Sequence, residues 1–170
     1  MKVAIYPGSF NPFHQGHYDI LMQSLELFDK VIVAIGLNVR KTTRGFKNAD
    51  DSELLVARYL RLNKQLAKFI GVGVDKYDGL LTDVVQLNQA THIIRGLRSG
   101  YDVEYEINLR KTIGDINPEI QFVYFVPSNP KFYHISSSMI RELAQYDRKA
   151  AEKYIFHPEH IGQDEDLILR

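Results

Sequence analysis

The sequence contains no cysteine, so disulfide bonds and thiolate metal ligands are excluded. It also lacks net charge, because 21 lysines and arginines balance 21 aspartates and glutamates. A balanced charge gives no general attraction to nucleic acid or anionic lipid, so any anion site must come from local placement of charge. No apolar run is long enough to cross a bilayer, and the run before Pro7-Gly8 is too short for the core of a signal peptide. We therefore expect a cytoplasmic protein that binds neither nucleic acid nor membranes.

The remaining composition is that of an ordinary globular protein, with 45% hydrophobic and 25% charged residues. A chain of 170 residues is long enough for one domain with a full core and short for two. We expect a single domain over residues 1–158, followed by a polar, acidic C-terminal tail over 159–170.

Short β-branched or aromatic runs alternate with stretches of helical periodicity along the whole chain. Such alternation predicts an α/β protein with a Rossmann-like, doubly wound, five-stranded parallel sheet and helices on both of its faces. Ligands of such sheets bind beyond the carboxyl ends of the strands, where the strand order reverses. The expected strands are 3–6, 31–35, 72–77, 92–95 and 121–126, and the expected helices begin near residue 17, after the polar loop 38–51, and near residues 80, 101, 137 and 148.

The stretch from Gly8 to His17 lies where the first strand turns into a helix, a place suited to a phosphate. The first amides of the helix have no internal partner there, and its dipole favours negative charge. His14 and His17 are open to three readings. A zinc site is disfavoured, because the other histidines show no partnering spacing, and we expect no metal site. Helix capping stays possible, and hydrogen bonding to a phosphate that is being transferred is favoured.

Cationic residues follow two other strands. Arg95-Gly96-Leu97-Arg98 ends a buried strand, which is costly unless an anion binds there, and guanidinium groups hold phosphates in a bidentate fork. Salt bridges to Asp102, Glu104 or Glu106 are the alternative and could coexist with anion binding. Lys41 lies in a basic loop after the second strand; it is either solvated or follows charge on a phosphate.

Hydroxyl and carboxylate groups complete the candidate set. Ser136, Ser137 and Ser138 begin a helix; one serine suffices for a cap, whereas three supply hydroxyls and amides for phosphate oxygens. Glu106 is either a helix-dipole partner, an anchor for a ribose, or a group that orients an arginine.

These motifs, in their order and spacing, resemble those of bacterial phosphopantetheine adenylyltransferases, members of the H-x-G-H nucleotidyltransferase superfamily. The likeness runs from Lys2 to Pro158. The segments that carry it are Gly8-Ser9-Phe10-Asn11-Pro12, His14-Gln15-Gly16-His17, Arg95-Gly96-Leu97-Arg98, Asp102-x-Glu104-Tyr105-Glu106 and Ile135-Ser136-Ser137-Ser138.

The resemblance implies an enzyme of coenzyme A biosynthesis. It would move AMP from ATP to 4′-phosphopantetheine by direct in-line attack, giving dephospho-coenzyme A and pyrophosphate, with Mg²⁺ accompanying ATP. Members of this family usually assemble as homohexamers.

The resemblance also implies roles for individual residues, with His17 stabilising the pentacoordinate phosphorus of ATP. The catalytic residues would be His17, Lys41 and Arg98. The acceptor substrate would bind Ser9, Phe10, Lys41 and Arg95. ATP would bind Gly8, Ser9, Phe10, His14, His17, Arg98, Glu106, Ser136, Ser137 and Ser138.

Several positions depart from the family pattern, and three of them bear on the identity of the acceptor. Asn11 and His14 stand where the family usually has aspartate and threonine, and Ile113 replaces an asparagine that contacts pantetheine. At the first two positions the residues resemble those of nicotinate or nicotinamide mononucleotide adenylyltransferases. That activity, and nucleotide binding without turnover, are therefore the alternative hypotheses.

Overall fold

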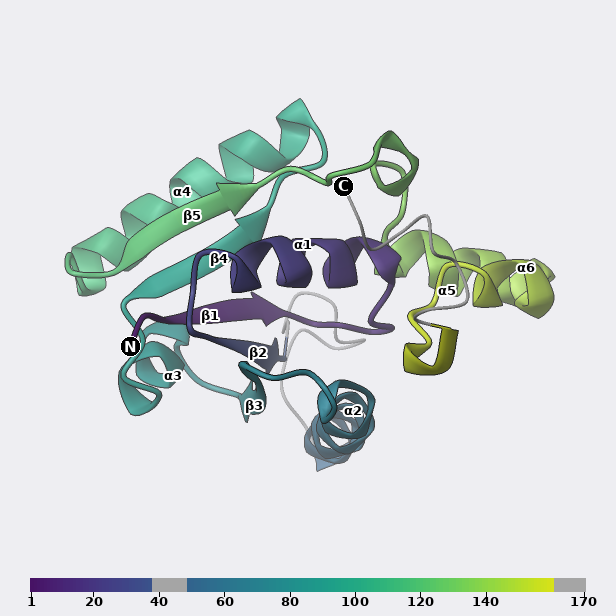
Figure 1. Cartoon of the computed structure of the whole chain (residues 1–170), viewed down its shortest axis with the longest axis horizontal. Helices are drawn as coiled ribbons and strands as arrows, with labels where there is room; N and C mark the ends of the chain where they lie inside the picture. The colour runs from purple at the N-terminus through teal and green to yellow at the C-terminus, as the bar shows by residue number, and fades with distance from the viewer. Residues whose placement is uncertain (38–48, 161–170) are drawn as a thin grey trace.

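A computed structural model describes residues 1–37 and 49–160 and contains a five-stranded sheet. All neighbouring strands are parallel, in the order β3-β2-β1-β4-β5, so the predicted fold class is confirmed (Figure 1). The strands lie within two residues of the bounds expected from sequence. They are β1 (Val3–Gly8), β2 (Lys30–Gly36), β3 (Val72–Tyr77), β4 (His92–Gly96) and β5 (Gln121–Phe125).

Helices cover both faces of this sheet, because alternate residues of each strand are apolar on both sides. The helices are α1 (Gln15–Leu25), α2 (Ala49–Leu66), α3 (Leu81–Leu87), α4 (Gly100–Ile116), α5 (Ser137–Tyr146) and α6 (Arg148–Glu152), with short 3-10 turns at Pro130–Phe132 and Pro158–His160. Ile20 of α1 and Leu62 of α2 pack on one face of the sheet. Val84 of α3 and Ile113 of α4 pack on the other.

Helices α5 and α6 lie beyond the carboxyl end of β1 (Figure 1). A small core of their own, which includes Phe132 and Ile140, holds them together. The segment after α6 is joined to the β1–α1 turn by main-chain hydrogen bonds, from Gln15 N to Tyr154 O (3.2 Å) and from Phe156 N to Phe13 O (3.2 Å). The C-terminal helices are thereby fixed next to the first turn of the sheet.

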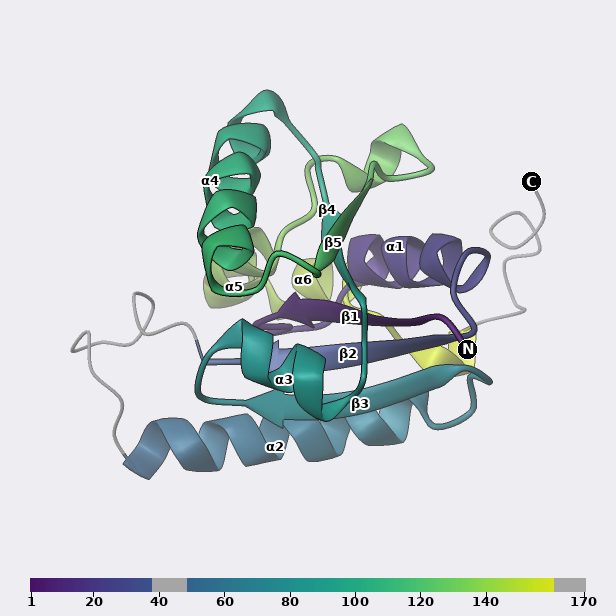
Figure 2. The ribbon, with the colours of Figure 1, turned by 90° about the vertical axis from the view of Figure 1, so that its left-hand side faces the viewer.

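The sheet opens at its centre. Strand β1 pairs with β2 as far as Gly8, but its ladder with β4 covers only Ala4 and Ile5. Figure 2 shows the cause, since β4 and β5 are tilted steeply relative to the other three strands. The carboxyl ends of β1 and β4 therefore separate at the point where strand order reverses, which is where open α/β sheets bind ligands.

Within the described part of the chain, no helix has both the length and the apolar character required to span a membrane.

Candidate active site

The two histidines cap the N-terminus of α1, and each imidazole accepts a hydrogen bond from the main-chain N–H of the other residue. The main-chain N–H of His17 donates to Nδ1 of His14, and the N–H of His14 donates to Nδ1 of His17, both over 3.3 Å. The imidazole rings stack with centroids 3.5 Å apart. His14 is 3% exposed, and His17 is partly buried. The capping reading of these histidines is thus confirmed, and it leaves one nitrogen of each ring available.

This arrangement sets the tautomer of both rings. An Nδ1 atom that accepts a hydrogen bond carries no hydrogen, so a neutral ring must carry it on Nε2. Burial, with the nearby Arg98 charge, lowers the pKa of His14 to about 3. Burial, His14 and Arg98 hold the pKa of His17 well below its ordinary value. Near neutral pH the pair therefore offers two uncharged Nε2–H donors.

The lowered pKa values predict acid sensitivity of the fold. Between pH 6.5, the ordinary histidine value, and about 3, the unfolded chain binds more protons than the folded chain. The contribution of these two histidines to the free energy of unfolding should therefore be fully present above pH 6.5. On acidification it should fall, at a rate approaching about 1.4 kcal/mol per pH unit for each such histidine. Denaturant unfolding measured from neutral to mildly acidic pH checks this slope.

His14→Asn provides the matched variant, because asparagine still caps a helix but does not titrate. Its slope with pH should be shallower than that of the unmodified protein, whatever its stability at neutral pH. His134→Asn, at an exposed histidine, should keep the original slope. Equal slopes for the original protein and His14→Asn would contradict the prediction.

The turn between β1 and α1 is shaped by Phe10. This residue has a φ of 44°, an unusual value for a bulky side chain, and its ring is 3% exposed. The ring lies over Gly8, where a Cβ atom would come within 2.8 Å of it. It also meets the His17 ring edge-on at 4.9 Å. Phe10 therefore supports His17, and any ligand contact from Phe10 itself would come from its main chain.

Arg98 joins the β4–α4 turn to the start of α5. Its Nη1 donates to the carbonyl of Ile135 over 3.2 Å, and its main-chain N–H donates to Asp102 over 2.9 Å. The charge of Arg98 is close enough to lower the pKa of both His14 and His17. Salt bridging to Asp102 and a place beside the histidines thus coexist in this arginine.

The three serines are all engaged at the start of α5. Ser136 is the N-cap and accepts from the Met139 N–H over 3.1 Å. The Ser137 hydroxyl donates to the carbonyl of Pro12 over 2.9 Å, which ties α5 to the β1–α1 turn. The first turn of α5, with its main-chain amides, is thereby held beside the first turn of α1.

Arg95 and Glu106 form a buried ion pair on the other side of the opened sheet. Nε and Nη2 of Arg95 donate to the two carboxylate oxygens of Glu106 over 2.7 and 2.6 Å. Nη1 donates to the carbonyl of Pro7 over 3.1 Å, so the guanidinium spans the gap between β4 and β1. Burial disfavours the charge of Arg95, but the hydrogen bond and charge of Glu106 outweigh it and raise the pKa. Glu106, 4% exposed, orients the arginine, which is one of the three roles considered for it from the sequence.

The structure thus brings together most of the predicted residues at the carboxyl ends of β1 and β4. Lys41 lies outside the described residues, so its role stays a prediction. The residues that meet around the two strand ends are Gly8, Phe10, His14, His17, Arg95, Arg98, Glu106, Ser136 and Ser137.

Two polar residues of this region were not among the predicted site residues. Arg141 of α5 donates to the carbonyl of Asn11 and, over 3.1 Å, to the hydroxyl of Ser138. Asp19 of α1 accepts from the main-chain N–H and the hydroxyl of Ser128 and so holds the β5–α5 loop against α1. The sequence offered one indication for Arg141, because it lies one helical turn after Ser138 at the start of a predicted helix. It offered none for Asp19, which lies in an ordinary amphipathic helix.

Comparison with known protein families decides the relationship. The model of the cytidylyltransferase-like family matches residues 5–143, a span that starts within β1, ends within α5 and contains every strand and helix between them. Phosphopantetheine adenylyltransferases match over nearly the full length of the chain. The chain belongs to the cytidylyltransferase-like family and, within it, to the phosphopantetheine adenylyltransferases.

Three relatives illustrate this similarity. The phosphopantetheine adenylyltransferase of Caldanaerobacter subterraneus subsp. tengcongensis is 40% identical over 147 residues, 86% of each chain. That of Clostridium perfringens strain SM101 is 36% identical over 170 residues, 99% of this chain and 96% of the relative. That of Porphyromonas gingivalis strain ATCC 33277 is 38% identical over 165 residues, 96% and 98% of the two chains.

Solved structures share the fold at low identity. A bifunctional NMN adenylyltransferase/ADP ribose pyrophosphatase from Francisella tularensis has a TM-score of 0.60 and 16% identity, covering 94% of this chain and 46% of that one. The lipopolysaccharide core biosynthesis protein from Thermoplasma volcanium GSS1 has a TM-score of 0.54 and 19% identity, covering 76% and 99%. Both similarities concern the fold alone.

Proposed function

We propose that this phosphopantetheine adenylyltransferase family member transfers the adenylyl group of ATP to 4′-phosphopantetheine, releasing pyrophosphate and dephospho-coenzyme A. Membership of the family at 35–40% identity over most of the chain supports the reaction. The structural observation that carries it is the meeting of the His14–His17 pair, Arg98 and the first turn of α5 at the open centre of the sheet.

This set of donors suits attack on phosphorus. A phosphate dianion is already a competent nucleophile, so the reaction needs positioning and neutralisation of charge rather than a general base. His17 would donate its Nε2–H to an oxygen of the α-phosphate as negative charge builds there. His14, Arg98 and the α5 amides would hold the phosphates of ATP, since an uncharged donor, a guanidinium and a helix N-terminus all bind anions.

The acceptor phosphate would lie on the side of Arg95. The ion pair with Glu106 fixes this guanidinium without using every one of its N–H groups. Ser9, the main chain of Phe10, and Lys41 would complete the acceptor site, with Lys41 following the charge during transfer. Ile113 of α4, where an amide side chain is usual in the family, is 5% exposed and packs in the core against the sheet, so it offers no polar contact to the acceptor.

Magnesium is proposed to arrive with ATP. Among residues 1–37 and 49–160, no group of three or more histidine, aspartate or glutamate side chains is placed to hold a metal ion. This fits Mg²⁺, which keeps several waters and is held largely by substrate phosphates. When bound, it would neutralise negative charge on ATP, while the protein residues bind and orient the phosphates. A cytoplasmic location is a further proposal, made from the sequence, and assembly as a homohexamer is one made from the resemblance.

Pyrophosphate release tests the activity directly. The purified protein with ATP and Mg²⁺ should release pyrophosphate when 4′-phosphopantetheine is supplied and remain silent with nicotinamide or nicotinate mononucleotide. Activity only with a mononucleotide would replace the proposed acceptor. Tight ATP binding without pyrophosphate from any of the three would instead indicate a nucleotide-binding protein that does not turn over.

A further inference from the structure

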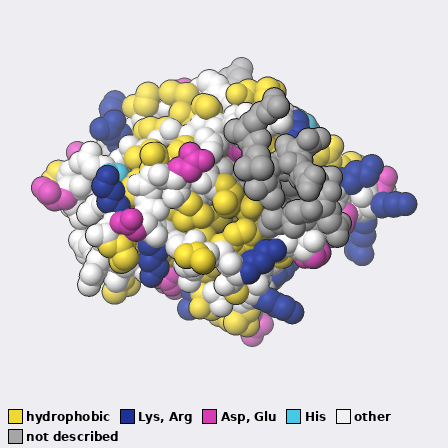
Figure 3. Space-filling model, viewed as in Figure 1, with side chains coloured by type: hydrophobic (Ala, Val, Ile, Leu, Met, Phe, Trp, Pro, Cys, Tyr) yellow, Lys and Arg dark blue, Asp and Glu magenta, His cyan; other side chains and the backbone are white. Residues whose placement is uncertain are grey.

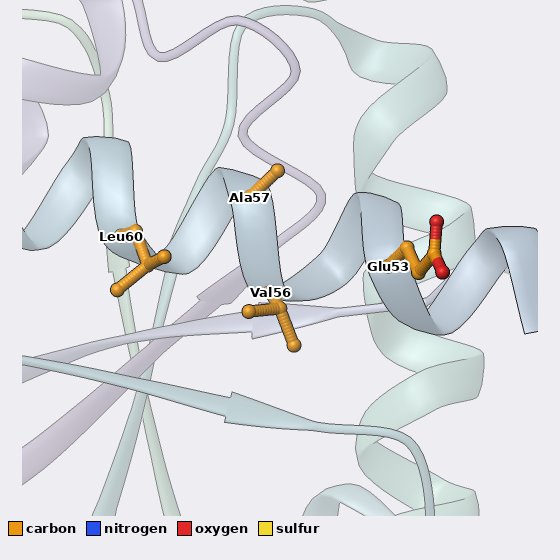
Figure 4. Close-up of a pocket in the computed structure, with 4 residues that line it drawn as sticks. All are labelled: Glu53, Val56, Ala57 and Leu60. Atoms are coloured by element: carbon orange, nitrogen blue, oxygen red, sulfur yellow. The ribbon is translucent and has the colours of Figure 1, made fainter.

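The outer face of α2 is apolar, although this helix already buries its inner face. Leu55, Leu62 and Leu66 pack into the core beside the sheet. On the opposite side, Glu53, Val56, Ala57 and Leu60 line a shallow depression of about 410 Å³. Figure 4 shows these four side chains following one another along the exposed side of the helix.

Large apolar side chains are left in solvent on this face. Leu60 is 60% exposed, Leu54 is 52% exposed and Val56 is 42% exposed. In the space-filling view, hydrophobic and basic side chains lie together in the region where Figure 1 places α2 (Figure 3). An apolar stripe of this kind, flanked by charges, marks an interaction surface.

The order of residues on this face is self-complementary about Ala57. Leu54 and Leu60 lie three residues before and after it, and Glu53 and Arg61 lie four residues before and after it. A second α2 placed antiparallel, with Ala57 opposite Ala57, therefore brings Leu54 level with Leu60 of the second copy. The same placement brings Glu53 level with Arg61, twice, because the contact is symmetric.

We propose that this face binds α2 of a second copy of the chain in an antiparallel, two-fold symmetric contact. The small side chain of Ala57 at the centre lets two helices approach to about 8–10 Å, the usual separation of packed helices. The leucines on either side then lose their exposure to water, and long Glu53 and Arg61 side chains reach across the seam. A different partner with a surface of one charge sign would pair with either Glu53 or Arg61, but not with both.

The contact goes beyond the proposed activity and does not rest on it. A helix of 18 residues is about 27 Å long, so the contact is small by itself and is expected to cooperate with other interfaces.

Charge reversal gives the sharpest test. In Glu53→Arg, the new guanidinium of each copy lies level with Arg61 of its partner, and in Arg61→Glu two acids meet in the same way. Sedimentation velocity of the full chain should show that each variant alone associates through the two-fold contact about tenfold more weakly or worse. Leu60→Asp should do the same. Leu87→Asp, at an apolar residue on α3 that is 82% exposed, is the control and should keep the original subunit count.

Mixing the two reversed variants distinguishes pairing from simple damage. One copy then carries two bases and the other two acids at the paired positions, so the mixture should recover the subunit count that each variant lost. A monomeric original protein, an unchanged subunit count in all three α2 variants, or a mixture that fails to reassociate would overturn the proposal. Pyrophosphate release is recorded separately, so loss of activity and loss of the contact are told apart.

Discussion

Replacing His17 by alanine is expected to lower turnover by about a hundredfold or more while leaving ATP affinity nearly unchanged. The reason lies in the state of the ring. Its Nδ1 is used by the His14 N–H, its pKa is far below neutral, and its Nε2–H remains as an oriented donor. A neutral donor gains most when charge develops on the phosphate oxygens, which happens in the transition state rather than in bound ATP.

The measurement combines steady-state pyrophosphate release with calorimetric titration of ATP. His134→Ala, at an exposed histidine that is not among the site residues, serves as the control and should retain both properties. His17→Asn keeps a donor on a shorter side chain, so part of the activity lost in His17→Ala should return. Equal losses of turnover and affinity in His17→Ala would instead make this imidazole a ground-state ligand.

Glu106→Ala is expected to reduce the free energy of unfolding by about 3–5 kcal/mol, because it leaves the Arg95 guanidinium without its carboxylate. Both partners are largely buried, with 20% of the Arg95 side chain and 6% of the Glu106 side chain exposed. Arg95→Met combined with Glu106→Leu removes the charge along with its partner, so it should cost less than Glu106→Ala alone. Denaturant unfolding of the three proteins compares these values.

The same variants separate structure from binding. If Arg95 binds the acceptor phosphate, the stable double variant should still bind ATP but show a strongly raised KM for 4′-phosphopantetheine. Glu104→Ala, at an exposed glutamate two residues earlier on α4, should leave stability and KM unchanged. A double variant as unstable as Glu106→Ala would mean that the pair acts through more than charge neutralisation.

Much of the fold was predictable because its signals are local. The apolar runs that became β1 to β5 are separated by turn residues and amphipathic helices, and the rule for open α/β sheets then places the residues that follow the strands at one edge of the sheet. The strand order, which makes β1 and β4 neighbours, came from the structure. The capping function of Ser136 and the start of α1 also follow from residues next to each other in the chain. Local hydrogen bonding determines such features, so no tertiary information was needed.

The pairing of charges could not be predicted in the same way. In the sequence, three acids lie close enough to Arg95 and Arg98 to pair with either of them. The path of α4 over the sheet decides that Glu106 pairs with Arg95 and Asp102 with Arg98. Arg141 and Asp19 contact carbonyl, amide or hydroxyl groups more than 100 residues away. Contacts of that separation depend on how two elements are packed, which residue spacing does not encode.

The sequence by itself therefore determined the alternation of strands and helices, the edge of the sheet where polar residues gather, and the family to which those residues correspond. Only the tertiary structure decided that the two imidazoles cap the start of α1 and stay uncharged, that the Phe10 ring meets the His17 ring edge-on, and that a buried ion pair bridges the opened strands. The physical reason is desolvation. Whether a polar group is charged, paired or free depends on what surrounds it in three dimensions, and burial sets that environment.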